Sequence, residues 1–529
     1  MFSQYFSRSP QHQPKESLHP PRLLKKDVYY AIGVTAVFVL VGGYTAIHHE
    51  MWRDEIQAWL LARDSASVFE LFANMKYEGH PAFWHLCLMP LSRINASPIM
   101  MQVFHLLIAA TTVFLFTRYA PFHWIHKFLF AFGYFALYEY AIVARNYAIG
   151  VLLITIFCVL YRERYKRFVW VGIVLILMAH TSVHALIVTI AIGFALMCEY
   201  LYFYCCKEVA FTENRRQIWI GFALIGFGIV TAVLQLNLPA DTGFAVGWNF
   251  KFTVQRMNAI TKIITQAMLP SPRATMGFWS SHQLNSYPFF QLIQLPLCYL
   301  IVLWCVIRFL KRPTALLTYL IATVELLAFF YVKYGGSIRH HGFLFFTFVL
   351  ASWIYYDCPE IKLKFNRISE FAQWVFGPVF VIILIVHFLG GITAVRMDIE
   401  HIFSNGKRTA EYIKAQGRQD MLMVGHRDPS VSTVVGYLEK DQVYYPRGRR
   451  FGSFVRWDKA RAHSVSNRDV VKEAKMLSTQ NSQDVLIIMS SALNVSQIEE
   501  YQLTLLEKFT GSTIGDEGFY LYLMKASSI

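Results

Sequence analysis

The sequence predicts a polytopic α-helical membrane protein of about eleven transmembrane helices with a small α/β domain at its C-terminal end. Three observations support this fold class. Of the 529 residues, 55% are hydrophobic and only 16% are charged, whereas an ordinary soluble domain has about 25% charged residues. Apolar segments long enough to span a bilayer recur along most of the chain. Basic residues alternate between the connections that join these segments.

The apolar segments lie in the region 28–395, which we expect to form one transmembrane domain. The first segment, 28–47, lacks a small-residue cleavage site, so it is predicted to be a retained helix rather than a signal peptide. The expected segments are 28–47, 99–117, 126–143, 146–161, 168–181, 184–204, 218–236, 287–307, 314–332, 341–356 and 373–392.

The basic residues predict the orientation of the chain. With the N-terminus in the cytoplasm, they gather in the inner connections, as the positive-inside rule requires. These residues are Arg118, Lys127, Arg162, Arg164, Lys166, Arg167, Lys207, Arg215, Arg216, Arg308, Lys311, Arg312, Lys362, Lys364 and Arg367. The polar, proline-containing residues 1–27 are then a disordered cytoplasmic tail.

The formal net charge of +15 is explained by these inner connections. Because no nucleic-acid-binding signature accompanies the charge, we expect no nucleic acid partner. We predict an integral membrane protein of a bacterial inner or plasma membrane, in preference to the endoplasmic reticulum.

Two outer loops are long. The first, 48–98, contains the apolar spacing of two short amphipathic helices, Asp54–Arg63 and Val68–Met75, which we expect to lie on the membrane surface. The second, 237–286, mixes aromatic residues with glycine and proline. It serves either as an interfacial anchor or as a lid over a site.

The composition becomes polar after Arg396. Strand-like runs (MLMVG, TVVGYL, QVYYP, DVLIIM and FYLYLM) alternate with helical patterns at Lys407–Gln416 and Asp469–Leu477. This alternation predicts an α/β domain over 396–529. Because an odd number of spans precedes it, the domain is expected to be extracytoplasmic.

The first outer loop carries acidic and imidazole groups, Asp54, Glu55, Glu78 and His80. A carboxylate placed there can act as a general base or bind a metal ion. The alternative is that these groups are surface charges and a helix cap. Their convergence with Arg145 and Arg339 on the outer face favours a site, because ionisable groups at membrane depth are costly.

Arginines open two of the later segments, Arg145 in ARNYAIG and Arg339 in SIRHHG. Arginine is well suited to phosphate, although each could simply extend its side chain to the interface. His340 and His341 follow Arg339, but adjacent histidines point in different directions on a helix. The sequence leaves open whether a divalent cation is a cofactor. Its candidate ligands are Asp54, Glu55 and His341.

The stretches WRDE, EGHPAFWH, ARNYA and IRHHGFL resemble the GT-C superfamily of membrane glycosyltransferases, nearest to the protein O-mannosyltransferases and the lipid A aminoarabinose transferases. The resemblance covers roughly residues 28–392. It implies an inverting transferase whose donor is a sugar linked to polyprenyl or dolichyl phosphate. Many relatives read His-Pro-Pro, whereas Ala82 follows Pro81 here, so the branch and the acceptor stay open.

The resemblance also implies roles for individual residues. Asp54 matches the catalytic acidic residue of the first loop, which would deprotonate or orient the acceptor, and Glu55 and Glu78 match supporting acidic positions. Arg145 and Arg339 match phosphate-contacting positions, and Tyr147 and His340 accompany them; with His80 these form the expected substrate-binding set. The acceptor is a glycolipid, a glycan or a protein. The alternatives are a transporter or flippase for a lipid-linked or small anionic substrate, and a non-catalytic assembly protein.

Overall fold

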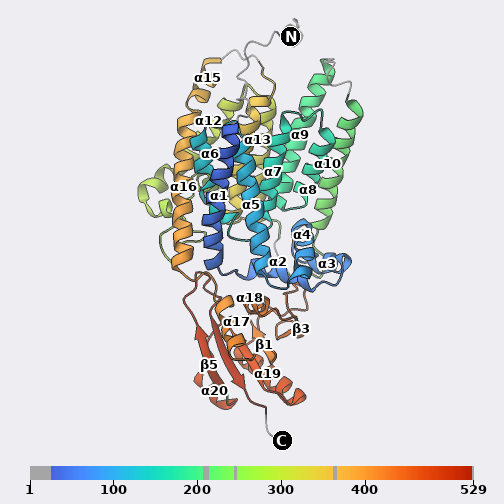
Figure 1. The fold of residues 1–529 in the computed structure, drawn as a ribbon, viewed down its shortest axis with the longest axis vertical. Coiled ribbons are helices and arrows are strands. Elements are labelled where there is room, and N and C mark those ends of the chain that lie inside the picture. Colours follow the sequence, from blue (N-terminus) through green and yellow to red (C-terminus); the bar gives the residue numbers. More distant parts are fainter. Residues whose placement is uncertain (1–24, 207–213, 244–246, 362–365, 527–529) are drawn as a thin grey trace.

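The computed structural model describes residues 25–206, 214–243, 247–361 and 366–526, and it consists of a helical bundle with a sheet domain at one end (Figure 1). The bundle begins with α1 (Lys25–His48), whose C-terminal end leads into short helices beside the sheet domain. Residues 1–24 of the expected cytoplasmic tail lie outside the described residues.

The helices confirm the predicted fold class. Within the described ranges, seven helical segments are long and apolar enough to cross a membrane. They are α1, α5 (Ile99–Tyr119), α9 (Val183–Cys205), α10 (Arg215–Gln235), α12 (Pro288–Phe309), α13 (Pro313–Val332) and the α15–α16 segment (Asn366–Trp374 and Phe376–Glu400). Two shorter apolar helices, α7 (Tyr147–Tyr161) and α8 (Phe168–Ala179), and the buried α14 (Ile338–Ile354) complete the bundle.

The expected segment 126–143 does not form one helix. Helix α6 (Trp124–Ala131) ends before Gly133, and a π-helical turn, η2 (Tyr134–Glu139), follows. The break lies where α16 passes very close, because a Cβ on Gly391 would stand 2.5 Å from the carbonyl oxygen of Phe132. The chain after the turn runs directly to Arg145, so the break places this arginine at the end of the bundle that faces the sheet.

The first outer loop forms three helices, α2 (Arg53–Asp64), α3 (Val68–Met75) and α4 (Phe83–Ile94). Two of them were expected, but the expected position of α2 was wrong. Its apolar face, which includes Ile56, Trp59 and Leu60, is completely buried between the bundle and the sheet domain rather than on a membrane surface. Helix α3 keeps exposed apolar side chains, Val68, Phe69 and Phe72.

The segment 237–286 contains one regular helix, α11 (Val254–Met268), which packs against α12 and α14 through Ile260, Ile263 and Ile264. The beginning of the segment is attached to the C-terminal domain, because Gly243 donates a 2.7 Å hydrogen bond to the carbonyl oxygen of Trp457. Two short 3-10 turns, η4 (Gln283–Ser286) and η5 (Tyr355–Asp357), join the neighbouring helices.

The C-terminal part forms a six-stranded sheet in the order β3-β2-β1-β4-β6-β5, in which β1, β2 and β4 are parallel. The strands are β1 (Leu422–His426), β2 (Val443–Tyr445), β3 (Arg450–Gly452), β4 (Val485–Met489), β5 (Thr504–Phe509) and β6 (Phe519–Met524). Leu486 and Ile488 face α17 (Gly406–Ala415) and α18 (Asp428–Leu438), whereas Val485 and Ile487 face α19 (Asn467–Asn481). A short helix, α20 (Val495–Glu500), precedes β5. Alternate residues of β4 thus pack against helices on opposite faces of the sheet, because successive side chains of a strand point to opposite faces.

One predicted strand of this domain is a helix. The run TVVGYL lies within α18, where Val431, Val434, Val435 and Leu438 are buried. Their spacing of three and four residues fits a helix, and Pro429 stands in the first turn, where proline is tolerated. The β-branched residues were misleading because a short apolar run does not distinguish a buried strand from a buried helix.

Helix α18 lies directly against α2, and a glycine permits the contact. A Cβ on Gly436 would stand 2.5 Å from Cγ2 of Ile56, whose side chain is completely buried. The next residue, Tyr437, accepts a 2.8 Å hydrogen bond from the backbone N–H of Met51. The C-terminal domain is therefore packed onto the segment that carries the predicted site.

We expect Gly436→Val to loosen this packing. The added methyl groups overlap a side chain that has no space to move into, which costs about 1–3 kcal/mol. The expected result is a lower melting temperature and faster proteolytic cleavage between the bundle and the sheet domain. Gly226→Val on α10, where an added Cβ has no neighbour within 4 Å, is the control and should change neither measurement. Equal stability of Gly436→Val and the unmodified protein would contradict the packing described.

Candidate active site

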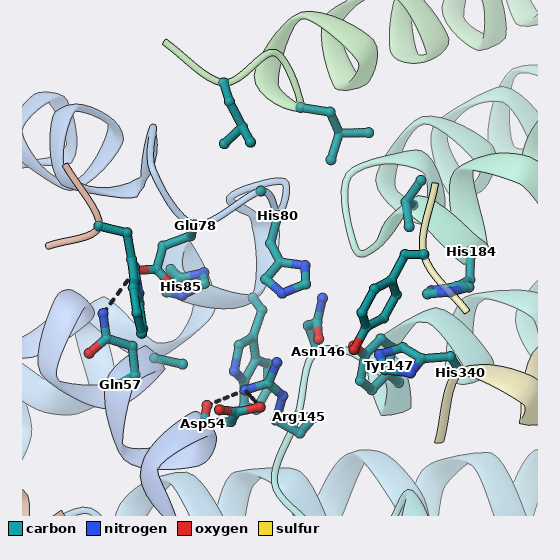
Figure 2. A pocket seen from close by; sticks show the side chains of 18 of the residues that line it. Asp54, Gln57, Glu78, His80, His85, Arg145, Asn146, Tyr147, His184 and His340 are labelled. Carbon is teal, nitrogen blue, oxygen red and sulfur yellow. Dashed lines mark hydrogen bonds and ion pairs between the residues drawn. The ribbon is translucent and has the colours of Figure 1, made fainter. Parts of the chain in front are cut away.

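A large cavity lies where the bundle meets the C-terminal domain. Its volume is about 1190 Å³. The polar part of its lining comes from α2, the loop before α4, the starts of α7, α9 and α14, and the C-terminal domain (Figure 2). The polar lining residues are Arg53, Asp54, Gln57, Glu78, His80, His85, Arg145, Asn146, Tyr147, His184, Asn237, Lys333, Tyr334, Arg339, His340, Arg427, Ser430, Ser432, Arg447 and Asp516.

Asp54 is held between two arginines from distant parts of the chain. Its Oδ2 lies 3.6 Å from Nη1 of Arg145 and 3.2 Å from Nη2 of Arg339. Arg145 also donates a hydrogen bond to the backbone carbonyl of Asp54. The Asp54 side chain is 32% exposed, so it faces the cavity without being sealed from it. The structure thus brings together three residues that the sequence placed on one face of the membrane.

Electrostatics keep Asp54 ionised. Burial acts to raise the pKa of its carboxyl group, but the nearby charges of Arg145 and Arg339 outweigh this effect and hold the pKa below its usual value. Asp54 contributes −1 and the arginines +2, so the cluster has a net charge of +1. Such a cluster can accept one singly charged anion.

The position of Arg339 is fixed by its neighbours on both sides. Its guanidinium lies 5.2 Å from the ring of Trp52 and 5.3 Å from the ring of Trp279. Gly336, three residues earlier, has φ +73°, a conformation that favours glycine. This turn allows Ser337 to cap α14 with His340 in a reciprocal capping box.

Glu55 does not reach the cavity. It is completely buried, and its carboxylate accepts hydrogen bonds from the backbone N–H groups of Trp52, at 3.1 Å, and Ala144, at 2.5 Å. Its Oε2 also lies 3.1 Å from Nε2 of His49, whose other nitrogen contacts Asp398. The side chain that we expected among the catalytic acids instead fixes the backbone immediately before Arg145.

Glu78 and His80 line the cavity beside Asp54 (Figure 2). Burial raises the pKa of Glu78 to about 7, although a 2.8 Å hydrogen bond from Gln57 and the charge of Arg145 oppose the shift. Burial, reinforced by Arg145, lowers the pKa of His80 to about 3. At neutral pH, His80 is therefore uncharged, and Glu78 exchanges a proton readily.

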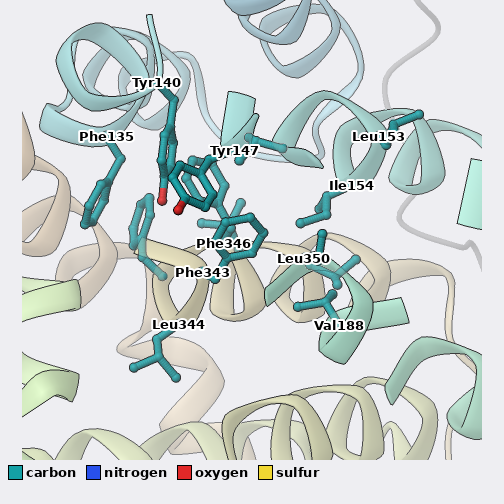
Figure 3. Packing of buried hydrophobic residues seen from close by; sticks show 14 of the residues in the cluster. Phe135, Tyr140, Tyr147, Leu153, Ile154, Val188, Phe343, Leu344, Phe346 and Leu350 are labelled. Carbon is teal, nitrogen blue, oxygen red and sulfur yellow. The ribbon is translucent and has the colours of Figure 1, made fainter. Parts of the chain in front are cut away.

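On the other side of the cavity, Tyr147 and His340 meet edge to face, with ring centroids 5.3 Å apart (Figure 2). Tyr147 also stands 5.9 Å from the guanidinium of Arg145. Phe343 of α14 and Tyr140, which follows the π-helical turn, pack against the ring of Tyr147 (Figure 3). Both predicted substrate-binding residues thus face the same space as Asp54.

The residues present do not fit a divalent cation. Within the described ranges, no three His, Cys, Asp or Glu side chains come together as a metal-binding group. His341 contacts the carbonyl oxygen of Gly335 through Nε2 and does not line the cavity, and Glu55 is engaged as described above. The proposed set Asp54, Glu55 and His341 is therefore not assembled.

Several cavity residues were missed by sequence reasoning. Gln57 stands in ordinary helical sequence, and His184 belongs to a polar hairpin, 180–184, that the sequence placed on the outer face without a role; the fold shows that both line the cavity. Trp52 and Trp279 support Arg339 from segments more than 200 residues apart. Arg427 and Arg447 come from the C-terminal domain, which was expected beside the site without any assigned residue.

One wall of the cavity is apolar. It is formed by the start of α9, the end of α10 and the end of α13, all at the same end of the bundle. Leu234 belongs to this wall and is nevertheless 66% exposed, so the cavity extends to the outer surface of the bundle. The apolar wall residues are Val183, Leu186, Ile187, Val233, Leu234, Leu236, Leu238 and Phe329.

Comparison with known proteins identifies the fold. The sequence matches no protein-family model and no curated protein. ArnT from Cupriavidus metallidurans bound to undecaprenyl phosphate is structurally similar over 94% of this chain and 98% of its own, with a TM-score of 0.50 and 11% identity. The chain has the fold of ArnT. The apo form of ArnT aligns with 94% of this chain and 99% of its own, at a TM-score of 0.48 and 12% identity. At 11% identity, this likeness shows a shared fold.

We expect Glu55→Gln to disturb the site without touching the cavity. The amide would turn an N–H group toward a backbone N–H donor, leaving a buried donor unsatisfied at a cost of about 1–3 kcal/mol. The expected result is a lower melting temperature, together with altered accessibility of Arg145 to a guanidine-modifying reagent. Glu163→Gln, on an exposed ion pair, should change neither. Unchanged stability and Arg145 reactivity in Glu55→Gln would refute the positioning role.

Proposed function

We propose that the protein is an integral membrane glycosyltransferase that transfers a sugar from a polyprenyl-phosphate-linked donor to a hydroxyl or amine of an acceptor. The observation that carries the proposal is the Asp54–Arg145–Arg339 cluster, which lies in a cavity with one apolar wall. A lipid-linked donor needs both features, a cationic site for phosphate and an apolar surface for the lipid.

Charge supports a monophosphate-linked donor. A lipid–phosphate–sugar diester has one negative charge, which balances the net charge of +1 of the cluster. Arg145 and Arg339 would hold the phosphate and stabilise the charge that develops on it as the bond to the sugar breaks.

Glu78 is the proposed general base. In the reaction, the acceptor oxygen or nitrogen forms a bond to the anomeric carbon as the bond from that carbon to the phosphate oxygen breaks. The acceptor proton passes to the Glu78 carboxylate, and the lipid phosphate departs. A pKa of about 7 suits this task better than the lowered pKa of Asp54, which is committed to the arginines. We expect a single displacement, with inversion at the anomeric carbon.

The apolar wall formed by α9, α10 and α13 is the proposed contact surface for the lipid. Its exposed member Leu234 marks where the chain would pass from the cavity to the membrane. The ArnT structure of the same fold was determined with undecaprenyl phosphate, which supports this class of donor.

The cavity is proposed to face the extracytoplasmic side. Basic residues cluster at the opposite end of the bundle, where Arg164 contacts the carbonyl of Asp357 and Arg312 contacts Glu360. Positive charge of this kind marks the cytoplasmic side. The C-terminal domain and the acceptor, whether glycolipid, glycan or protein, would then lie outside the cytoplasm.

The placement of the lining residues favours an enzyme over a transporter. The lining residues of α9, α10, α13 and α14 all come from the helix ends nearest the C-terminal domain. A transporter needs a polar path near the middle of the bilayer.

We expect Arg339→Ala to lose about 10²–10³-fold in turnover, because one of the two groups that stabilise the phosphate charge is removed. Sugar release from a polyprenyl-phosphate sugar, followed with the purified protein in lipid nanodiscs, measures this loss. Arg396→Ala, an exposed arginine on α16, is the matched control and should keep full activity. Undiminished turnover in Arg339→Ala would contradict the proposed function.

The pH dependence of activity distinguishes Glu78 from Asp54 as the base. A base must be deprotonated, so with Glu78 in this role kcat should rise with pH through a midpoint near 7. Glu78→Gln should remove this rise and lower kcat by about 10²–10⁴-fold. With Asp54 as the base, the rise would lie at more acidic pH than an ordinary aspartate gives, because the charges of Arg145 and Arg339 lower the pKa of Asp54. A rise near pH 7 that persists in Glu78→Gln would refute the assignment.

A further inference from the structure

His184 is a buried histidine whose ring has no hydrogen bond. It is the second residue of α9, lines the cavity beside the apolar wall and is only 2% exposed. Neither Nδ1 nor Nε2 has a partner among the described residues. Because buried polar atoms are rarely left unsatisfied in native structures, this ring needs an explanation.

The surroundings of His184 would suit an apolar ring equally well. Phe343 stacks against it at a centroid distance of 5.5 Å, and Phe329 and Phe330 lie at 5.7 and 5.6 Å. Tyr147 stands at 6.0 Å, on the side toward Arg145 (Figure 2). Phenylalanine would fill this space without burying two unpaired nitrogen atoms.

His340 offers a hydrogen-bond donor beside His184. Their ring centroids are 5.0 Å apart. Nδ1 of His340 accepts a 2.8 Å hydrogen bond from the backbone N–H of Ser337, so in the neutral ring the proton is on Nε2. Both residues line the cavity, and Arg339 immediately precedes His340.

We propose that His184 and His340 form an uncharged second half of the phosphate site, in which their imidazole N–H groups donate hydrogen bonds to phosphoryl oxygens of the lipid phosphate. This inference rests on the proposed function and adds a binding residue to it. The ligand chemistry is that of a phosphate ester, with Arg145 and Arg339 on one side and the two imidazoles on the other.

The position of His184 favours the phosphate over the sugar. Its neighbours on α9, Val183 and Leu186, belong to the apolar wall, so His184 adjoins the surface on which the lipid is proposed to lie. In a lipid–phosphate–sugar donor, the phosphate is the first polar group after the lipid. Uncharged hydrogen-bond donors such as imidazole N–H groups also suit a site that must release its product. They bind the departing lipid phosphate without adding permanent positive charge to the site.

The test uses undecaprenyl phosphate, which carries the phosphate and lipid but no sugar. The full-length protein in nanodiscs should bind it at least about tenfold more weakly after His184→Phe, the loss expected for one hydrogen bond to a charged group. The melting temperature of the ligand-free variant should equal or exceed that of the unmodified protein, because two unpaired nitrogens are removed. His184→Gln, which keeps an N–H donor, should bind more tightly than His184→Phe.

His387→Phe is the matched control. His387 is also buried against phenylalanine, with Phe345 at 4.0 Å, but it lies outside the cavity, so its replacement should leave binding unchanged. Unchanged binding in His184→Phe, a sharply lower melting temperature, or a loss confined to the sugar-linked donor would each overturn the inference. A failure of the unmodified protein to bind undecaprenyl phosphate would instead refute the proposed function itself.

Discussion

The rest of the site depends on one interaction, the carboxylate of Asp54 between the guanidinium groups of Arg145 and Arg339. The three charges come from segments that are far apart in sequence, and each lowers the cost of burying the others. Neighbouring side chains hold the two arginines of this cluster in place. Glu55 holds the backbone before Arg145, and two tryptophans enclose Arg339.

The C-terminal domain is part of this arrangement rather than an appendage. It covers α2 through the close approach of Gly436 to Ile56, and it also fixes Gln57, whose amide bridges Glu78 and the backbone of Val455. The proposed base is therefore positioned by a residue that the C-terminal domain holds. A short helix such as α2 is only marginally stable alone, and burial between two larger units gives it a defined orientation.

Much of the fold followed from the sequence because long apolar runs and alternating basic connections are strong, local signals. The segment 126–143 failed because its apolar composition did not reveal the turn at Gly133, and TVVGYL failed because its β-branched residues concealed a helical spacing. In the site, Asp54, Arg145 and Arg339 were found because charges beside a membrane are conspicuous. Glu55 was assigned wrongly to the cavity because adjacent residues on a helix point in different directions, and sequence does not show which one faces it. His184 received no role because the sequence shows neither its burial nor the absence, among the described residues, of hydrogen-bond partners for its ring.

The exposure of Leu234 at the edge of the cavity has a consequence for how a substrate would be encountered. A donor that reaches the cavity between helices diffuses in the plane of the bilayer, so its supply depends on its mole fraction among lipids rather than on its amount per volume of water. The acceptor, if water-borne, is governed by an ordinary concentration. The protein would then join a donor that diffuses in the membrane to an acceptor that diffuses in water. Dilution of the membrane with inert lipid would slow the binding of the donor and leave the binding of the acceptor unchanged.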